Sequence, residues 1–357
     1  MTSRSHPPRR AVLAAAGATL ALALGGGAGR SSFAMAADWA TFKRRFVQDP
    51  GRVVDTGNNG VSHSESQGWG MLFAEHHDDR QTFERLWTWT AATLRRPDKL
   101  FSWRFVPGVR DPVADKNNAS DGDILIAWAL SRAAIRWNEP RYAAESRALQ
   151  IVILNRMIVD DAGSKILLPG VSGFQRGERW VVNLSYYVWP AFQHFAATGV
   201  ESRRWLQLEA DGLKLLDRAS FGAFGLPPDW ALVGKGAALV ADDWPPYFGF
   251  DAVRVPLYLA WGNHKQRLGR YIAAWQAVKV GSRPPAWIDL RSGALSSFPG
   301  SEGVESIFTL ISAAAGVRNL RSFAPLNDGD DYYSASLKML VDMAARETAR
   351  LSLPPKT

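Results

Sequence analysis

The chain has 357 residues, of which 42 are Lys or Arg and 34 are Asp or Glu, so its formal charge is +8, and 46% of its residues are hydrophobic. This composition excludes a disordered polyelectrolyte, because such chains lack the apolar surface whose burial offsets the entropy cost of folding. The absence of cysteine excludes disulfide scaffolds, thiolate metal sites, iron–sulfur clusters and cysteine nucleophiles.

The first 36 residues have the layout of a secretory signal. Residues 1–10 carry three arginines and no acid, residues 11–28 are almost wholly apolar or glycine, and Ala34 and Ala36 fit the −3 and −1 positions of a cleavage site. We therefore expect export to the periplasm or the medium. The Arg9-Arg10 pair leaves the twin-arginine and the general secretion routes both open.

Removal of this segment halves the net charge of the chain. It carries four of the arginines and no acid, so the remaining chain has a charge of only +4, with its basic residues interleaved with acidic ones. A nucleic-acid partner is not expected, because it would require a concentrated basic face. No later window has 18 consecutive apolar residues, so we expect no membrane span in the mature chain.

Residues 37–357 are predicted to form one compact all-α domain. About a dozen helices would use up this length at roughly 27 residues per helix and loop. The 15 Trp indicate either a thick helical core or exposed rings on which flat ligands stack. Long loops are predicted at 107–119, 160–181 and 222–247. Apolar residues at helical spacing predict helices at 66–77, 80–95, 121–137, 141–158, 201–217, 251–261, 263–278, 304–315 and 331–348.

The first candidate functional residue is Glu65, in the segment SHSESQGWGM at 62–71. A structural interpretation is available, because Ser62 and Glu65 have the spacing of a capping box. Capping does not explain Gly68 and Gly70 on either side of Trp69, since glycine in a helix costs about 1 kcal/mol relative to alanine. The two glycines therefore indicate close approach by another group.

The second and third candidates are also acidic residues near predicted helix starts. Asp121 lies in NNASDGD at 117–123, where Ser120 and Asp123 again have capping-box spacing and Asp121 is favoured by the helix dipole. Asp251 lies in YFGFDAVR at 247–254 and could cap a helix and pair with Arg254. Aromatic residues surround Asp251, and a carboxylate next to apolar rings loses hydration free energy unless water or a ligand is present.

These three segments resemble the motifs of glycoside hydrolase family 8. Residues 119–137 meet every fixed position of the family signature A-S/T-D-A/G-D, while SESQGWGM and FDAVRVP are similar to two further family motifs in family order. LLPG, NLSYY, LPPDW and DYY add weaker likenesses, so the resemblance covers nearly all of the mature chain. Ser66, Trp69 and Leu184 depart from the usual family residues, and these departures bear on substrate preference.

The resemblance implies an (α/α)6 barrel, with six inner and six outer helices and a substrate cleft across the loop end. It also implies an endo-β-1,4-glucanase that inverts anomeric configuration. Glu65 would then be the general acid, Asp251 the general base, and Asp121 the residue that holds the distorted sugar. Inversion places acid and base about 6.5–9.5 Å apart, with a water between them.

Further residues are expected to bind the substrate. By resemblance, Arg254 would orient Asp251 and Tyr186 would hydrogen-bond near the attacking water. Trp69, Trp103 and Trp230 lie in or beside motifs and are candidates for stacking on sugar rings. No metal or cofactor is expected. The adjacent His76 and His77 point about 100° apart on a helix and could not chelate as an i, i+4 pair would.

Several alternatives stay open at this stage. Within the family, the protein could be a xylanase, a lichenase or a chitosanase, although the context of Asp251 resembles the cellulase and xylanase branch. A protein of another class, a non-catalytic glucan-binding accessory, would not need all three carboxylates. A single exported domain without a binding module resembles the periplasmic enzyme that trims nascent cellulose beside the bacterial cellulose synthase complex. The partners expected are β-1,4-glucan chains and that complex, and the chain is expected to be a monomer.

Overall fold

A computed structural model describes residues 32–317 and 323–351. The predicted signal segment lies outside these residues, except that residues 32–36 begin the first helix. Within the described residues there are eleven α-helices, where about a dozen were predicted. They are α1 (Ser32–Phe46), α2 (Ser64–His76), α3 (Arg80–Thr93), α4 (Ser120–Arg136), α5 (Pro140–Arg156), α6 (Trp189–Thr198), α7 (Ser202–Arg218), α8 (Arg254–Trp261), α9 (Gly269–Ala277), α10 (Glu302–Ala314) and α11 (Tyr332–Leu351).

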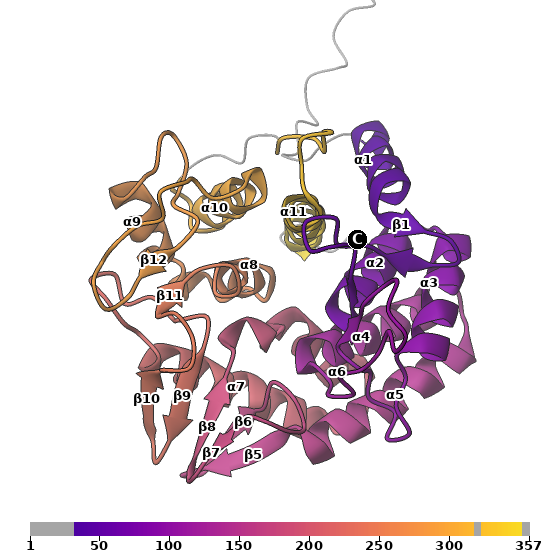
Figure 1. Cartoon of the computed structure of the whole chain (residues 1–357), viewed down its shortest axis with the longest axis horizontal. Helices are drawn as coiled ribbons and strands as arrows, with labels where there is room; N and C mark the ends of the chain where they lie inside the picture. The colour runs from indigo at the N-terminus through magenta and orange to yellow at the C-terminus, as the bar shows by residue number, and fades with distance from the viewer. Residues whose placement is uncertain (1–31, 318–322, 352–357) are drawn as a thin grey trace, which may run out of the picture.

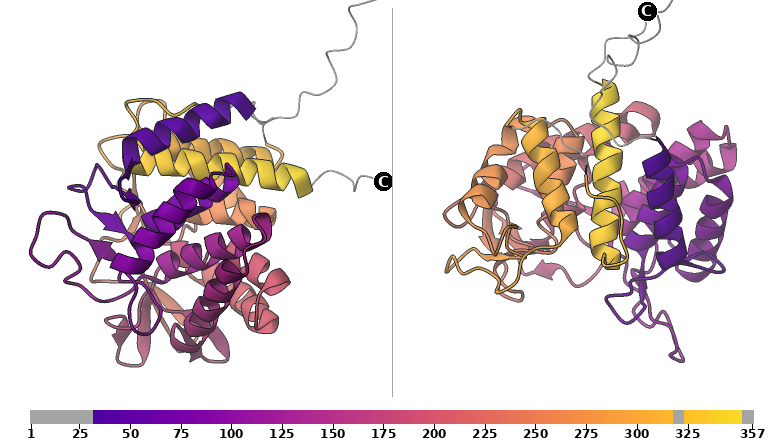
Figure 2. Two further views of the ribbon diagram at one scale, coloured as in Figure 1. Left: turned by 90° about the vertical axis from the view of Figure 1, so that its right-hand side faces the viewer. Right: turned by 90° about the horizontal axis from the view of Figure 1, so that it is seen from above.

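The helices form a closed barrel, as the resemblance to glycoside hydrolase family 8 implied (Figure 1). Contacts run from α2 to α4, α4 to α6, α6 to α8, α8 to α10 and α11, and from α11 back to α2. Helices α3, α5, α7 and α9 pack outside this ring, and α1 lies along α11 (Figure 2). The two ends of the described chain therefore meet, which closes the circle of helices.

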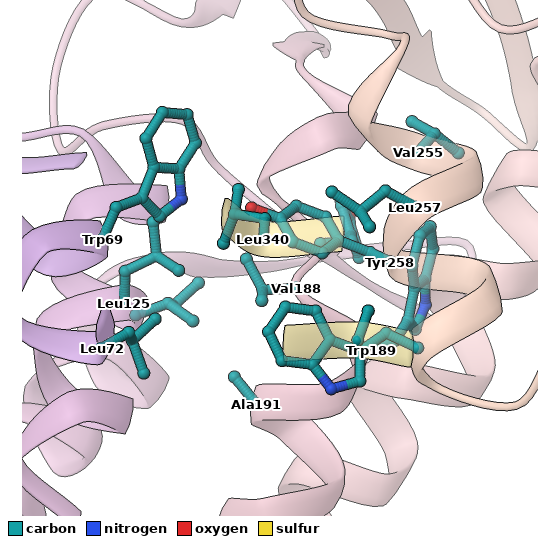
Figure 3. Packing of buried hydrophobic residues seen from close by; sticks show 14 of the residues in the cluster. Trp69, Leu72, Leu125, Val188, Trp189, Ala191, Val255, Leu257, Tyr258 and Leu340 are labelled. Atoms are coloured by element: carbon teal, nitrogen blue, oxygen red, sulfur yellow. The ribbon is translucent and has the colours of Figure 1, made fainter. Parts of the chain in front are cut away.

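Large apolar side chains fill the interior of the barrel. Trp69, Leu125, Trp189, Tyr258 and Leu340 come from five different helices and converge there (Figure 3). All five are buried. Burial of one such side chain contributes roughly 1.5–3 kcal/mol relative to exposure, so the interior is a packed core that holds the helix ends in register.

All nine predicted helical segments are confirmed, with ends that differ by a few residues. Helices α1 and α6 were missed. Helix α6 is only ten residues long, and its sequence WPAFQHFAAT is apolar almost all round, so it shows no amphipathic stripe.

The prediction of long loops at 160–181 and 222–247 is wrong, because both segments contain strands. Strands β5 (Ile158–Asp161) and β6 (Ser164–Leu167) form a hairpin. Strands β7 (Gln175–Arg176), β8 (Arg179–Val182), β9 (Ala231–Gly234) and β10 (Ala237–Val240) form an antiparallel sheet in the order β10-β9-β8-β7. None exceeds four residues, which is too short to show the alternation that identifies a strand.

The remaining six strands are each two residues long and form three antiparallel pairs that connect the loops. They are β1 (Val47–Gln48) with β2 (Arg52–Val53), β3 (Ser62–His63) with β4 (Arg104–Phe105), and β11 (Tyr247–Phe248) with β12 (Ile288–Asp289). Two 3₁₀ turns, η1 (Leu184–Tyr186) and η2 (Lys265–Arg267), complete the described structure. Strands β3, β8 and β11 each lead directly into a segment that carries a candidate site residue.

Candidate active site

Helices α2 and α4 cross closely at their first turns because two glycines make room. A Cβ on Gly122 would lie 2.0 Å from Oγ of Ser64 and 2.8 Å from the backbone N of Glu65. A Cβ on Gly68 would lie 2.6 Å from a side-chain carbon of α4. The close approach that Gly68 predicted is therefore confirmed, and its source is α4 itself. The crossing brings Glu65 beside Asp121, with which it shares a side-chain hydrogen bond.

The surroundings of Glu65 favour its protonated form. Its side chain is 20% exposed. Burial raises the pKa of Glu65 well above its usual value; the positive charge of Arg254 opposes this shift, whereas the negative charges of Asp121 and Asp251 add to it. A carboxyl group that stays neutral at a pH where most are ionised can donate a proton, which is the requirement for a general acid.

Asp121 is the hydrogen-bonding partner of that acid. Its side chain is buried, and its Oδ1 accepts the backbone N–H of Gly122 at 2.7 Å. Burial raises the pKa of Asp121 to about 6, while Arg254 and the hydrogen bond from Glu65 oppose the rise. At neutral pH Asp121 is therefore ionised and accepts the proton that Glu65 shares.

Asp251 lies in the turn before α8, and Arg254 is the first residue of that helix. Nη2 of Arg254 donates to Oδ1 of Asp251 at 3.0 Å, so the predicted pairing one turn apart is confirmed. The same nitrogen donates to Oγ of Ser185 at 2.8 Å and lies 3.3 Å from Oε1 of Glu65. Arg254 is only 4% exposed, so one buried cation joins the two carboxyl groups that lie furthest apart in the sequence.

This shared nitrogen limits the separation of the two carboxyl groups. Oε1 of Glu65 and Oδ1 of Asp251 lie 3.3 Å and 3.0 Å from Nη2 of Arg254. They can be no further apart than the sum of these lengths, about 6.3 Å. An inverting hydrolase has its carboxyl groups about 6.5–9.5 Å apart and a retaining one about 5–5.5 Å. The limit applies only to the two oxygens that face Arg254, and it lies between the retaining and the inverting ranges, just below the latter.

The sheet brings Tyr186 and Trp230 together. Val182 at the end of β8 pairs with Ala231 at the start of β9, so the residues just beyond this pair are neighbours. The ring centroids of Tyr186 and Trp230 are 6.1 Å apart, in an edge-to-face arrangement. Tyr186 also lies near enough to the three carboxyl groups for their charges to act on its hydroxyl. Burial raises the pKa of its hydroxyl well above the ordinary value, and the negative charges of Asp121, Asp251 and Glu65 add to the rise.

Trp230 is part of a row of parallel rings rather than a lone platform. Its ring is stacked with Phe174 at 5.9 Å and 1°, and with Trp244 at 4.8 Å and 16°. All three side chains are half-buried. Sequence reasoning missed Phe174 and Trp244, because both lie in segments that were predicted as long loops, and no motif singled out these two residues.

The expectation that Trp69 stacks on a sugar is corrected by its burial. Its side chain is fully buried in the barrel core, so it presents no ring face to a ligand. The guanidinium carbon of Arg254 lies 5.8 Å from the Trp69 ring centroid instead. Trp69 thus supports the cation that joins Glu65 and Asp251, by a cation–π contact.

Trp103 is half-buried and firmly oriented. Its indole Nε1 donates to Oδ2 of Asp115 at 2.7 Å, and its ring is stacked parallel to His63 at 5.9 Å. Its carbonyl O accepts the backbone N–H of Ser64 at 3.0 Å, which ties it to the start of α2. Trp103 therefore lies beside the candidate site, at the end of the barrel where Glu65 is located.

The capping box predicted from Ser62 and Glu65 is wrong. Helix α2 begins two residues after Ser62, and the backbone N–H of His63 donates to Oγ of Ser66 at 2.9 Å. Ser66 therefore does the capping, and the Glu65 side chain belongs to the carboxyl cluster.

The box predicted from Ser120 and Asp123 is also wrong. Oδ1 of Asp123 accepts the backbone N–H of Phe101 at 2.8 Å, and its Oδ2 accepts Nδ2 of Asn118 at 2.7 Å. Burial raises the pKa of Asp123 to about 7. This carboxyl ties the loop before α4 to the helix.

Sequence reasoning missed two polar residues at the site. Ser185 accepts a hydrogen bond from Arg254. Oδ1 of Asp229 accepts three backbone N–H groups, from Gly249, Asp251 and Ala252, at 3.1, 3.1 and 2.7 Å. The LPPDW segment was noted for its tryptophan, but nothing in the sequence links residue 229 to residue 251, since the contact depends on the sheet.

The described residues form neither a metal-ligand cluster nor a membrane-spanning helix. Across residues 32–317 and 323–351, no three His, Asp or Glu side chains are grouped as metal ligands would be. No helix in the same part of the chain combines the length and apolar character needed to cross a bilayer.

The chain is similar to known proteins over most of its length. The family model for glycosyl hydrolases family 8 matches residues 15–347. A relative from Novacetimonas hansenii, named "Probable endoglucanase", is 40% identical over 320 residues, which are 88% of this chain and 92% of the relative. A Cellulomonas uda protein named "Endoglucanase" is 41% identical over 271 residues, 75% of each chain.

The fold of the chain is also similar to that of solved structures. The structure of endo-beta-1,4-glucanase CMCax from Acetobacter xylinum is 39% identical, with a TM-score of 0.83, and the match covers 89% of this chain and 99% of that one. Endoglucanase Cel10 from Klebsiella pneumoniae, described as a family 8 glycosyl hydrolase, is 39% identical with a TM-score of 0.82, covering 87% and 99% of the two chains.

Proposed function

The chain belongs to the glycosyl hydrolases family 8, and we propose that it is an endo-β-1,4-glucanase with Glu65 as general acid and Asp251 as general base. One observation carries the assignment of roles: a carboxyl group favoured in its protonated form and a second carboxylate both contact one buried Arg254 nitrogen. Relatives named as endoglucanases, at about 40% identity over most of the chain, support the substrate class.

The acid step uses the proton that Glu65 shares with Asp121. Glu65 delivers it to the glycosidic oxygen as the bond to the anomeric carbon breaks. The carboxylate that remains on Glu65 lies 3.3 Å from Nη2 of Arg254, so its new negative charge is compensated without movement. Asp121, held by Gly122 and ionised at neutral pH, is in position to stabilise positive charge that develops on the sugar.

The base step uses Asp251. A water beside its carboxylate attacks the anomeric carbon from the face opposite the leaving group, and Asp251 takes the water proton. Arg254 fixes the direction of the Asp251 carboxylate through Oδ1. Tyr186, close to all three carboxyl groups, is proposed to hydrogen-bond near this water.

Substrate binding is assigned to the aromatic residues beside the carboxyl cluster. The half-buried side chains of Phe174, Trp230, Trp244 and Trp103 are proposed to supply the apolar surface against which glucose units pack. Xylan, lichenan and chitosan are therefore compared with cellulose derivatives as substrates in the same assay.

The test is a pair of substitutions that keep size and remove acid–base function. Glu65→Gln and Asp251→Asn should each lower kcat on carboxymethylcellulose by at least about 10²-fold. Both should still bind cellohexaose in calorimetry. Glu305→Gln and Asp328→Asn change exposed acids away from the site and should have parental activity. Near-parental turnover by either site variant would contradict the roles. A parent that binds the glucan without releasing reducing sugar would instead support the non-catalytic binding protein.

We further propose that the chain is exported and trims nascent β-1,4-glucan in the periplasm beside the cellulose synthase complex. The signal-like residues 1–36 support export. N-terminal sequencing of the protein from a periplasmic fraction should give Ala37. A cytoplasmic protein starting at Met1 would contradict export.

We also propose a monomer, because this chain supplies by itself the three carboxyl groups and the buried Arg254 that the proposed reaction needs. Static light scattering should give a mass near that of a single mature chain. A stable dimer at micromolar concentration would contradict this.

A further inference from the structure

We propose that Asp229 is a positioning residue for the general base, and that it fixes the turn at residues 249–252 on which Asp251 is carried. The proposal rests on the assignment of Asp251 as base. It concerns a residue that the reaction chemistry itself does not require, since Asp229 need not touch the substrate to act through the backbone of that turn.

The contacts of Asp229 are concentrated on this one turn. Its Oδ1 accepts the N–H groups of Gly249, Asp251 and Ala252. Its own N–H donates to the carbonyl O of Tyr247 at 2.7 Å. Asp229 therefore fastens both the strand that enters the turn and three of the four residues in it.

Two side chains of the turn are partly exposed. The Asp251 side chain is 29% exposed and Phe250 is 53% exposed, so neither is held by close packing. The carboxylate of Asp251 is bound by Arg254, and the carbonyl O of Phe250 accepts the hydroxyl of Tyr333. The carbonyl groups of Gly249, Asp251 and Ala252 accept backbone N–H groups from the residues that follow. Asp229 is thus the anchor that holds the turn backbone through its N–H groups.

The fit at Gly249 argues that the contact is close and specific. A Cβ on Gly249 would lie 2.7 Å from Oδ2 of Asp229, so a side chain there would push the carboxyl group away. Burial, and then the negative charge of Asp251, raise the pKa of Asp229 to about 7, although the three donors oppose the rise. Placing a carboxyl group so near the proposed base has an electrostatic cost, and the positioning of the turn accounts for it.

Loss of this anchor should damage turnover more than binding. A displacement of about 1 Å at a catalytic group can cost on the order of 10² in rate, because the reacting atoms leave the productive geometry. The acid Glu65 is carried by α2 and not by this turn. We therefore expect Asp229→Ala to lower kcat at least about tenfold, with KM changed less than about threefold.

The experiment compares three variants on carboxymethylcellulose and cellohexaose. Asp229→Asn keeps an oxygen acceptor at Oδ1 and should restore kcat to within about threefold of the parent. Asp161→Ala is the matched control: Asp161 is a buried carboxyl that accepts the backbone N–H groups of Lys235 and Gly236 at 2.7 and 3.3 Å, in the β9–β10 turn. The Asp161→Ala variant should have a lower free energy of unfolding but the parental kcat per folded molecule. Tryptophan fluorescence measures the folded fraction by which kcat is normalised.

Three outcomes would overturn the proposal. They are an Asp229→Ala kcat within threefold of the parent, an Asp229→Asn variant as slow as Asp229→Ala, or an increase in KM at unchanged kcat. If Asp229→Ala does not fold, Asp229→Ser carries the same test, because its shorter side chain cannot reach all three N–H groups. An active Asp251→Asn would refute the proposed base, whereas an inactive Asp251→Asn beside a fast Asp229→Ala would refute only the positioning role.

Discussion

The carboxyl cluster should destabilise the fold at neutral pH, and Asp121→Asn tests this directly. The pKa of Asp121 is raised from 3.8 to about 6 in the folded protein. Between these two pH values the folded protein binds a proton that the unfolded chain does not. The contribution of Asp121 to the free energy of unfolding is therefore fully present below pH 3.8 and is lost as the pH rises through 6. A shift of about two units corresponds to about 3 kcal/mol.

Asparagine has the same shape and cannot ionise, so it removes this cost. Its Oδ1 can still accept the N–H of Gly122. Asp121→Asn should therefore raise the free energy of unfolding by up to about 3 kcal/mol at pH 7.5 and by almost nothing at pH 3.5. The gain should come with a loss of activity, because a neutral residue cannot stabilise positive charge on the sugar.

Urea unfolding followed by tryptophan fluorescence, at several pH values between 3.5 and 7.5, measures the difference. Asp328→Asn, at an exposed position, is the control and should match the parent throughout. The reasoning is refuted if Asp121→Asn is less stable than the parent at pH 7.5. It is equally refuted if the gain is the same at pH 3.5 as at pH 7.5.

Three further predictions concern the same site. Gly122→Ala should lower the free energy of unfolding, measured in urea, by about 1–3 kcal/mol and should also lower kcat, because the new Cβ separates α2 from α4. Gly269→Ala is the control and should change neither quantity, because its Cβ would meet no atom within 4 Å. The alkaline limb of the kcat–pH profile should move to lower pH in Asp121→Asn, because the negative charge that helps to raise the pKa of Glu65 is gone; an unmoved limb would exclude Glu65 as its source. Trp230→Ala should raise KM for cellohexaose by about three- to tenfold and leave kcat within about twofold, and a fall in kcat alone would argue against a binding role.

The helices and the three acidic motifs could be predicted from the sequence because their signals are local. Helical periodicity gave nine segments, and the short motifs around Glu65, Asp121 and Asp251 are each contained within one helix start or turn. The unusual glycine at position 68 correctly indicated close packing, since its cost is only repaid by the approach of α4.

The features that could not be predicted depend on contacts between distant residues. The pairing of Val182 with Ala231 creates the aromatic row around Trp230, and strands of four residues leave no periodic signal. The burial of Trp69 depends on how the barrel closes. The hydrogen bonds from residues 249–252 to Asp229 likewise follow from the fold, because no spacing rule connects the two segments.

The stereochemistry of hydrolysis tests the central claim most directly, that Asp251 activates water opposite the acid Glu65. Proton NMR of products formed from cellohexaose in the first minutes identifies the new anomer before mutarotation. The α-anomer is expected, as single displacement by a water on Asp251 requires. Initial release of the β-anomer would contradict the account, and the limit of about 6.3 Å between the two Arg254-bound oxygens would then reflect a pair close enough for a covalent intermediate.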